Sequence, residues 1–116
     1  MPTFLNTARL SQPDHYRRVF DNPEYRVSSG AFLLLATPGA TQSSRLGLVF
    51  AKKNIRLAVR RNRIKRLVRE HFRHHAFEEA IDLVVLARSG ADHLDNPRLW
   101  QDLDQLWNAL VKKVNS

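Results

Sequence analysis

The stretch RLGLVFAKKNIRLAVRRNRIKRLVREHFRH, residues 45–74, contains the two kinds of element that set the fold class. Its first part, Arg45 to Ala51, is typical of a β-strand, and the part from Ala58 to His74 is typical of an α-helix. The helix is expected because its apolar residues fall on one face when each residue advances by about 100°. A strand that leads into a long helix indicates a mixed α and β architecture.

The neighbouring segments supply further strands and a closing helix. Val27 to Ser28 and Ala31 to Thr37 are expected to be strands, and the second should pair as a hairpin with the strand at Arg45–Ala51. Leu83 to Ala87 is a continuous apolar run, typical of a strand buried on both faces. A final helix is expected to begin at Asn96, with a proline in its first turn.

A short helix is expected near the N-terminus, capped by Ser11, with Pro13 in its first turn and an apolar stripe of Tyr16, Val19 and Phe20. The resulting order of elements is α-β-β-β-α-β-α. In a chain of 116 residues this order predicts a single domain, residues 1–116. Its class is an α+β sandwich, with helices packed on a small four-stranded sheet.

Positive charge is concentrated in one segment of the chain. The whole chain carries a net charge of +8. Between Lys52 and Arg73, ten basic residues accompany a single acid, Glu70, so this segment carries +9. The rest of the chain has nine basic and ten acidic residues and carries −1. A cationic segment threaded with the apolar residues of a helix indicates a nucleic-acid contact surface, and a plain solvated helix is the alternative.

The composition also excludes several kinds of protein. The chain has no cysteine, which excludes disulfides, thiol catalysis and cysteine-ligated zinc. The N-terminus has no apolar core of signal-peptide length. The longest apolar run, Ala31 to Ala36, is far shorter than the ~20 residues that a membrane helix needs. We therefore expect a soluble, cytoplasmic protein without a membrane partner.

The basic helix divides its polar residues into two groups. Arg60 and Arg61 fall near the apolar face in the first turn, where a bound phosphate would relieve their unfavourable interaction with the helix dipole. The opposite side is expected to be an exposed ridge of Asn62, Arg66, Arg69 and Arg73. Arginine pairs bidentately with phosphate. Exposed aromatic rings stack on unpaired bases, and the candidates are Tyr16, Phe20, Phe32 and Phe50. Each ring is equally well explained as core, Phe50 above all.

Together these residues resemble a known family, the bacterial ribonuclease P protein subunit. The resemblance rests on a run of motifs: Gly47, Lys52-Lys53, Ala58-Val59, Arg61-Asn62-Arg63 and Ile64-Lys65-Arg66. It extends to the two aromatic residues four apart in the first helix and to the last strand, at Asp82 to Arg88. It implies a left-handed crossover through the basic helix, against the usual right-handed rule.

The resemblance also implies an activity and its partners. The protein would be part of an endoribonuclease that acts as a ribonucleoprotein and removes the 5′ leader of precursor tRNA by phosphodiester hydrolysis. The catalytic RNA and the substrate would hold the Mg²⁺ ions. The protein alone is expected to be inactive, with no catalytic residue and no metal ligand of its own. Its expected partners are the catalytic ribonuclease P RNA and precursor tRNA, and no DNA.

Two groups of residues are assigned to RNA contact by the same resemblance. The catalytic RNA is expected at Lys53, Arg61, Asn62, Arg63, Lys65, Arg66 and Arg69. The leader is expected between the first helix and the sheet, at Tyr16, Phe20, Lys52, Arg60 and Arg61. The sequence departs from the family at Leu35, where some members place a tyrosine in this cleft.

Other functions explain less of the sequence. A protein nuclease would need grouped acids to hold metal ions, and the acids here are scattered. His71 and His75 have the i, i+4 spacing of a zinc site, but His71 is expected to face the core, and a solvated helix end explains its neighbours. A helix-turn-helix DNA-binding protein fits the strands badly. A ribosomal protein explains the charge, size and fold, but not the Arg-Asn-Arg motif.

Overall fold

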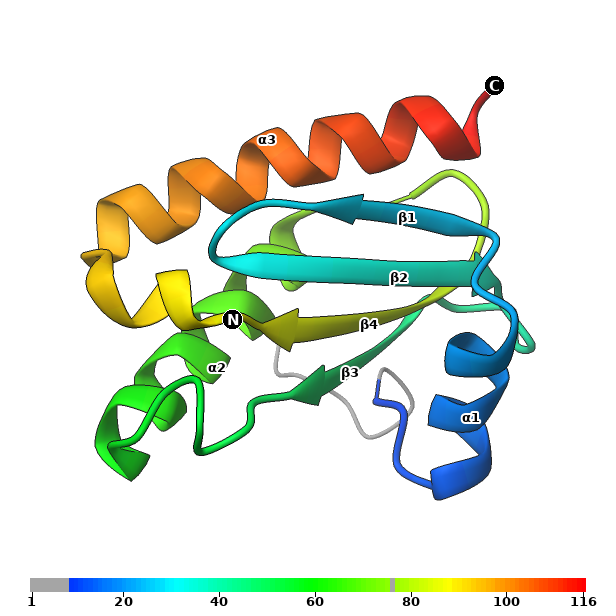
Figure 1. The fold of residues 1–116 in the computed structure, drawn as a ribbon. Helices are drawn as coiled ribbons and strands as arrows, with labels where there is room; N and C mark the ends of the chain where they lie inside the picture. The colour runs from blue at the N-terminus through cyan, green and yellow to red at the C-terminus, as the bar shows by residue number, and fades with distance from the viewer. Residues whose placement is uncertain (1–8, 76) are drawn as a thin grey trace.

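The computed structural model describes residues 9–75 and 77–116, and Figure 1 shows their arrangement. The elements follow in the order α1 (Pro13–Asp21), β1 (Tyr25–Ser28), β2 (Phe32–Pro38), β3 (Arg45–Val49), α2 (Ala58–His74), β4 (Ile81–Ala87), η2 (Ser89–His93) and α3 (Asn96–Val114). The predicted order α-β-β-β-α-β-α is confirmed. The short 3₁₀ helix η2 is an addition, because its sequence indicated only a turn.

The four strands form one mixed sheet in the order β1-β2-β4-β3. β1 and β2 form an antiparallel hairpin, β4 is antiparallel to β2, and β3 is parallel to β4. The predicted hairpin between the second and third strands is therefore wrong, because β4 lies between them. A strand that is apolar on both faces is best buried at the centre of a sheet, and six of the seven residues of β4 are buried.

The parallel pair of β3 and β4 requires a crossover connection, and α2 supplies it (Figure 1). This is the connection for which the family resemblance implies a left-handed path. It places the basic helix beside the edge strand β3 and fixes where its charged side faces.

Helices cover the two faces of the sheet unequally. One face carries the larger core, in which Leu34 and Leu83 of the strands pack with Ile64 of α2 and Leu103 of α3. Of the helices in residues 9–75 and 77–116, only α1 packs on the other face, through a smaller core that comprises Leu10, Val19, Leu35 and Val84. On this face Leu33, Val49 and Leu86 are only half-buried. These three side chains therefore keep part of their surface accessible.

The starts of the helices follow from local hydrogen bonding. α1 begins at Pro13 with Gln12 as N-cap, so the predicted cap at Ser11 is wrong by one residue. The Nδ1 atom of His15 accepts from the backbone N–H groups of Ser11 and Gln12, at 3.3 and 3.4 Å. The predicted limits of α2 and the start of α3 at Asn96 are confirmed. None of the described helices has the length and apolar composition to cross a membrane.

A buried carboxylate fixes α1 to the sheet. Asp82 of β4 is fully buried and accepts hydrogen bonds from Nε and Nη2 of Arg45, at 3.1 and 2.9 Å, and from Arg18 of α1. Burial by itself would raise the pKa of Asp82. The hydrogen bonds from Arg45 and Arg18 outweigh burial, so the pKa is lowered. The hydrogen bond to Asp82 also raises the pKa of Arg45.

Candidate nucleic-acid interface

The basic segment Lys52–Arg73 occupies the loop before α2 and the outer side of α2. Seven of its ten cations have no hydrogen bond or ion pair to another residue in the part of the chain that the structure describes. Five of the seven are exposed, namely Lys52, Lys53, Arg56, Arg63 and Arg66. The other two, Lys65 and Arg69, are half-buried. Asn62 is exposed among them. This surface has the charge and the donors to bind several phosphates.

Arg60 and Arg61 lie in a different environment from the one predicted. The Arg60 guanidinium donates to the backbone carbonyls of Ala91, Asp92 and Leu94, and its Nε lies 3.4 Å from the Asp92 carboxylate. Nη1 of Arg61 donates to the carbonyls of Ile55 and Arg56, both at 2.9 Å. Carbonyl oxygens thus compensate these two charges where a phosphate was expected, and Arg60 connects α2 to η2.

The predicted ridge opposite the core is only partly exposed. Asn62 and Arg66 face solvent, whereas Arg69 is half-buried. Arg73 pairs with Glu70, and the Arg73 side chain is 16% exposed. Burial lowers the pKa of Arg69. Hydrogen bonds from Arg73 and then His74 lower the pKa of Glu70. The single acid of the segment is therefore neutralised locally, and it pairs with none of the seven cations named above.

Arg69 faces a recess that joins α2 to α1. The recess has a volume of 260 Å³ beside the edge strand β3, and its walls are Arg9, Leu10, Ser11, Tyr16, Leu46, Leu48, Lys65 and Arg69. Tyr16 belongs to the residues assigned to the leader, and Lys65 and Arg69 belong to those assigned to the catalytic RNA. The recess thus brings one residue of the predicted leader group together with two of the predicted RNA group.

The four candidate aromatic rings differ in burial. Phe20 is 40% exposed and Tyr16 is half-buried, whereas Phe32 is completely buried in the larger core. Phe50, expected to be the most buried ring, is only half-buried, with Nζ of Lys65 5.9 Å from its centroid. Leu35 is 7% exposed and packs in the core under α1, so it is not part of an open cleft wall. Tyr16 and Phe20 are therefore the two candidate rings on α1 that keep part of their surface accessible.

The position of Tyr16 depends on a glycine. A Cβ atom added at Gly47 of β3 would lie 2.5 Å from Cε1 of Tyr16 and 2.8 Å from its Cζ. These separations are shorter than van der Waals contact, so only glycine allows the ring to lie against the strand. The tyrosine therefore rests on the backbone of β3, at the edge of the recess.

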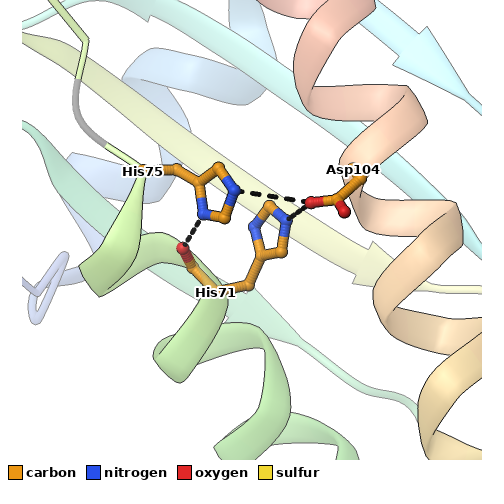
Figure 2. A group of neighbouring side chains, drawn as sticks. All are labelled: His71, His75 and Asp104. Atoms are coloured by element: carbon orange, nitrogen blue, oxygen red, sulfur yellow. Dashed lines mark hydrogen bonds and ion pairs between the residues drawn. The ribbon is translucent and has the colours of Figure 1, made fainter.

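A second polar cluster lies at the other end of α2, and Figure 2 shows its three side chains. His71 is 1% exposed, and its Nε2 lies 2.7 Å from Oδ1 of Asp104 in α3. Burial outweighs this hydrogen bond and lowers the pKa of His71. The expectation that His71 faces the core is confirmed. Asp104 was not identified from the sequence, because only the packing of α3 against α2 brings it there.

A mixed sheet covered by helices, with a concentration of exposed cations on and before α2, is an arrangement suited to contact with nucleic acid. Residues 4–111 match the family model described as Ribonuclease P. Because this match covers nearly the whole sequence, the chain belongs to the ribonuclease P protein family.

Individual relatives agree with this assignment. The chain is 45% identical over 111 residues to the ribonuclease P protein component of Marinobacter nauticus, covering 96% of this chain and 84% of that protein. It is 48% identical over 110 residues to the ribonuclease P protein component of Stutzerimonas stutzeri, covering 94% of this chain and 84% of that protein. Its fold matches the RNase P protein of Staphylococcus aureus with a TM-score of 0.81 at 26% identity, covering 88% of this chain and 94% of that one.

Proposed function

We propose that the chain is the protein subunit of a ribonuclease P that binds a catalytic RNA and the 5′ leader of precursor tRNA. In this role it promotes Mg²⁺-dependent removal of the leader, in the cytoplasm. The observation that carries the proposal is the surface of seven cations on and before α2 that pair with no described residue, in a chain of this family. Such a surface attracts a polyanion without competition from the protein's own acids.

The catalytic RNA is assigned to the outer side of α2 and the loop before it. The contact residues are Lys53, Arg61, Asn62, Arg63, Lys65, Arg66 and Arg69. Arg61 contributes through the edge of its guanidinium that is not bonded to the two loop carbonyls. Arg69 and Lys65 lie where this surface meets the recess, so RNA bound on α2 reaches the foot of α1.

The leader is assigned to the side of α1 and to Lys52. Tyr16 and Phe20 are four residues apart on α1, so their rings stand on neighbouring turns. Two such rings can stack on successive unpaired bases with little regard to base identity. Two residues expected in this group are left out. Arg60 is left out because four acceptors within the protein bind its guanidinium, and Arg61 because its Nη1 donates to the carbonyls of Ile55 and Arg56.

The chain's own contribution to the reaction is to position RNA. Mg²⁺ supplies Lewis-acid stabilisation of the phosphate oxygens in hydrolysis of this kind. The proposed RNA-binding surface consists of cations, which repel Mg²⁺ but attract the phosphates that hold it. The metal ions are therefore assigned to the RNA and the substrate.

A reconstitution experiment tests the proposed function. The purified chain, freed of RNA, should not cleave precursor tRNA in Mg²⁺. Addition of a bacterial ribonuclease P RNA should give cleavage at the 5′ end of the mature tRNA, at a Mg²⁺ concentration too low for the RNA alone. Cleavage by the RNA-free chain, or no effect of the chain on the RNA, would overturn the proposal.

Removing either ring from α1 should weaken binding of precursor tRNA specifically. Stacking contributes about 1–3 kcal/mol per base, so Tyr16→Ala or Phe20→Ala should weaken binding to the holoenzyme about 5- to 150-fold. Mature tRNA lacks the leader, and its binding should barely change. The measurements are both tRNA affinities and the melting temperature of each variant. Equal losses for the two tRNAs would remove these rings from the leader site.

Gly47→Ala should act on the leader through Tyr16. The added methyl group displaces the ring from the strand, so affinity for precursor tRNA should fall in the same direction as in Tyr16→Ala, and by no more. Gly30→Ala is the matched control, because a Cβ there meets nothing within 4 Å. Combining Gly47→Ala with Tyr16→Ala should add no further loss. Full additivity would show that Gly47 acts independently of Tyr16.

A further inference from the structure

We propose that His71, His75 and Asp104 form a binding site for one divalent transition-metal ion of the zinc type. His71 belongs to the last turn of α2, His75 is the C-cap residue of that helix, and Asp104 lies on α3 (Figure 2). Their ligand atoms all lie within 4.8 Å of one another. Two imidazoles and one carboxylate are a common set of protein ligands for zinc.

Hydrogen bonding already selects the ligand atom of His75. Its Nδ1 lies 2.6 Å from the backbone carbonyl oxygen of His71 and donates to it. A histidine that binds a metal through one nitrogen usually donates its other N–H to a carbonyl or carboxylate, which fixes the ring. Nε2 of His75 is therefore the free nitrogen, and it faces Oδ1 of Asp104 at 3.4 Å.

The distances between these atoms suit a tetrahedral ion. With metal–ligand bonds of about 2.0–2.2 Å, ligand atoms at tetrahedral angles lie about 3.4 Å apart. Oδ1 of Asp104 is 3.4 Å from Nε2 of His75 and 2.7 Å from Nε2 of His71. The shorter distance is that of a hydrogen bond, and metal binding at Nε2 would move the His71 proton to Nδ1 and lengthen this distance.

One ring must tilt to complete the coordination. The two imidazoles are stacked, with centroids 3.8 Å apart and planes 5° from parallel, so an ion in the plane of one lies outside the plane of the other. The His71 ring makes edge-to-face contacts with Trp100 and Trp107, with ring centroids 4.8 and 5.2 Å apart, respectively. His75 lies beyond the helix and its side chain is 31% exposed, so its ring can tilt about the hydrogen bond from its Nδ1 to the His71 carbonyl.

The donor set distinguishes this ion from Mg²⁺. Imidazole nitrogen favours Zn²⁺, Cu²⁺ and Ni²⁺, whereas Mg²⁺ prefers carboxylates, carbonyls and water. Asp104 is 44% exposed, so water has access to the remaining coordination position. A bound ion would join the end of the basic helix to α3, which makes the site a structural connection.

Titration of the untagged, chelator-treated chain with ZnCl₂ tests the proposal. Calorimetry should show one ion per chain, and Co²⁺ should give the visible absorption of a tetrahedral site. At a Zn²⁺ concentration about 100 times its Kd, the melting temperature should rise by about 10 °C, and equal Mg²⁺ should not raise it. Absence of saturable Zn²⁺ binding would overturn the proposal.

Three variants locate the ion. His75→Ala and Asp104→Asn each remove one ligand and should weaken Zn²⁺ binding at least about tenfold, since even outer-shell changes cost 10- to 100-fold. Asp104→Asn keeps an oxygen to accept from His71, so the metal-free variant should melt close to the unsubstituted chain. His74→Ala is the matched control, because His74 pairs with Glu70 instead. Unchanged affinity in both ligand variants, or an equal loss in the control, would contradict the site.

Discussion

The affinity of the chain for the catalytic RNA is expected to fall about a thousandfold between about 50 and 200 mM salt. Each phosphate that a cation neutralises releases counterions, and about six contacts produce a fall of this size. Seven cations of the basic segment are unpaired among the described residues, which is enough to supply six contacts. The measurement is the slope of the logarithm of the binding constant against the logarithm of the salt concentration.

Single substitutions on α2 show which cations contribute to that slope. Arg66 is exposed and unpaired, so Arg66→Ala should flatten the slope by somewhat less than one unit. Arg73 lies two turns further along the same helix and pairs with Glu70, so Arg73→Ala should change the slope much less. An unchanged slope in Arg66→Ala would mean that the outer side of α2 is only a solvated surface.

Substitution of Asp82 by asparagine should be the most destabilising single change outside the apolar core. Arg45 lies against Asp82 with its side chain only 10% exposed, so loss of the carboxylate leaves a buried charge unpaired. Breaking a buried pair in this way costs about 3–5 kcal/mol of unfolding free energy. Urea denaturation of the two proteins measures the difference. A loss below about 1 kcal/mol would show that Arg45 finds other partners or reaches water.

The contacts of Asp82 with Arg45 and Arg18 also supply a control variant and predict how stability depends on pH. The Arg18 side chain is 40% exposed, so water replaces part of its contact, and Arg18→Met should cost about 1 kcal/mol or less. The pKa of Asp82 is lower in the folded protein than in the unfolded chain. Its stabilising contribution is therefore complete above about pH 4 and is lost as the pH falls further, because the unfolded chain binds the proton first. In Asp82→Asn, the unfolding free energy should therefore depend less on pH below about pH 4.

Local sequence patterns predicted the elements well and the pairing of the strands less well. The limits of α2 follow from the apolar side that Ile64 and Val68 define, and the start of α3 follows from proline chemistry. The pairing of β3 with the preceding strand was wrong, because adjacency in sequence was the only available guide. The partner of β3 is instead decided by the need to bury both faces of β4.

The candidate site was predictable where it depends on local sequence and not where it depends on packing. The cations of the Arg-Asn-Arg helix and the rings of α1 stand out in the sequence. The helical projection placed Arg60 near the apolar face, but the carbonyls that bind it come from η2, about thirty residues later. Asp104 likewise reaches His71 only through contact between α2 and α3.

The central position of β4 has a consequence for the synthesis of the protein. β3 pairs within the sheet only with β4, and β4 follows the basic helix in the chain. While the ribosome is still making residues 75–87, the first three strands have no complete sheet against which α2 can pack. The arginines of α2 are therefore synthesised before the sheet that positions them is complete. The sheet that holds the cationic side of α2 in place is complete only after β4 has left the ribosome and inserted between β2 and β3.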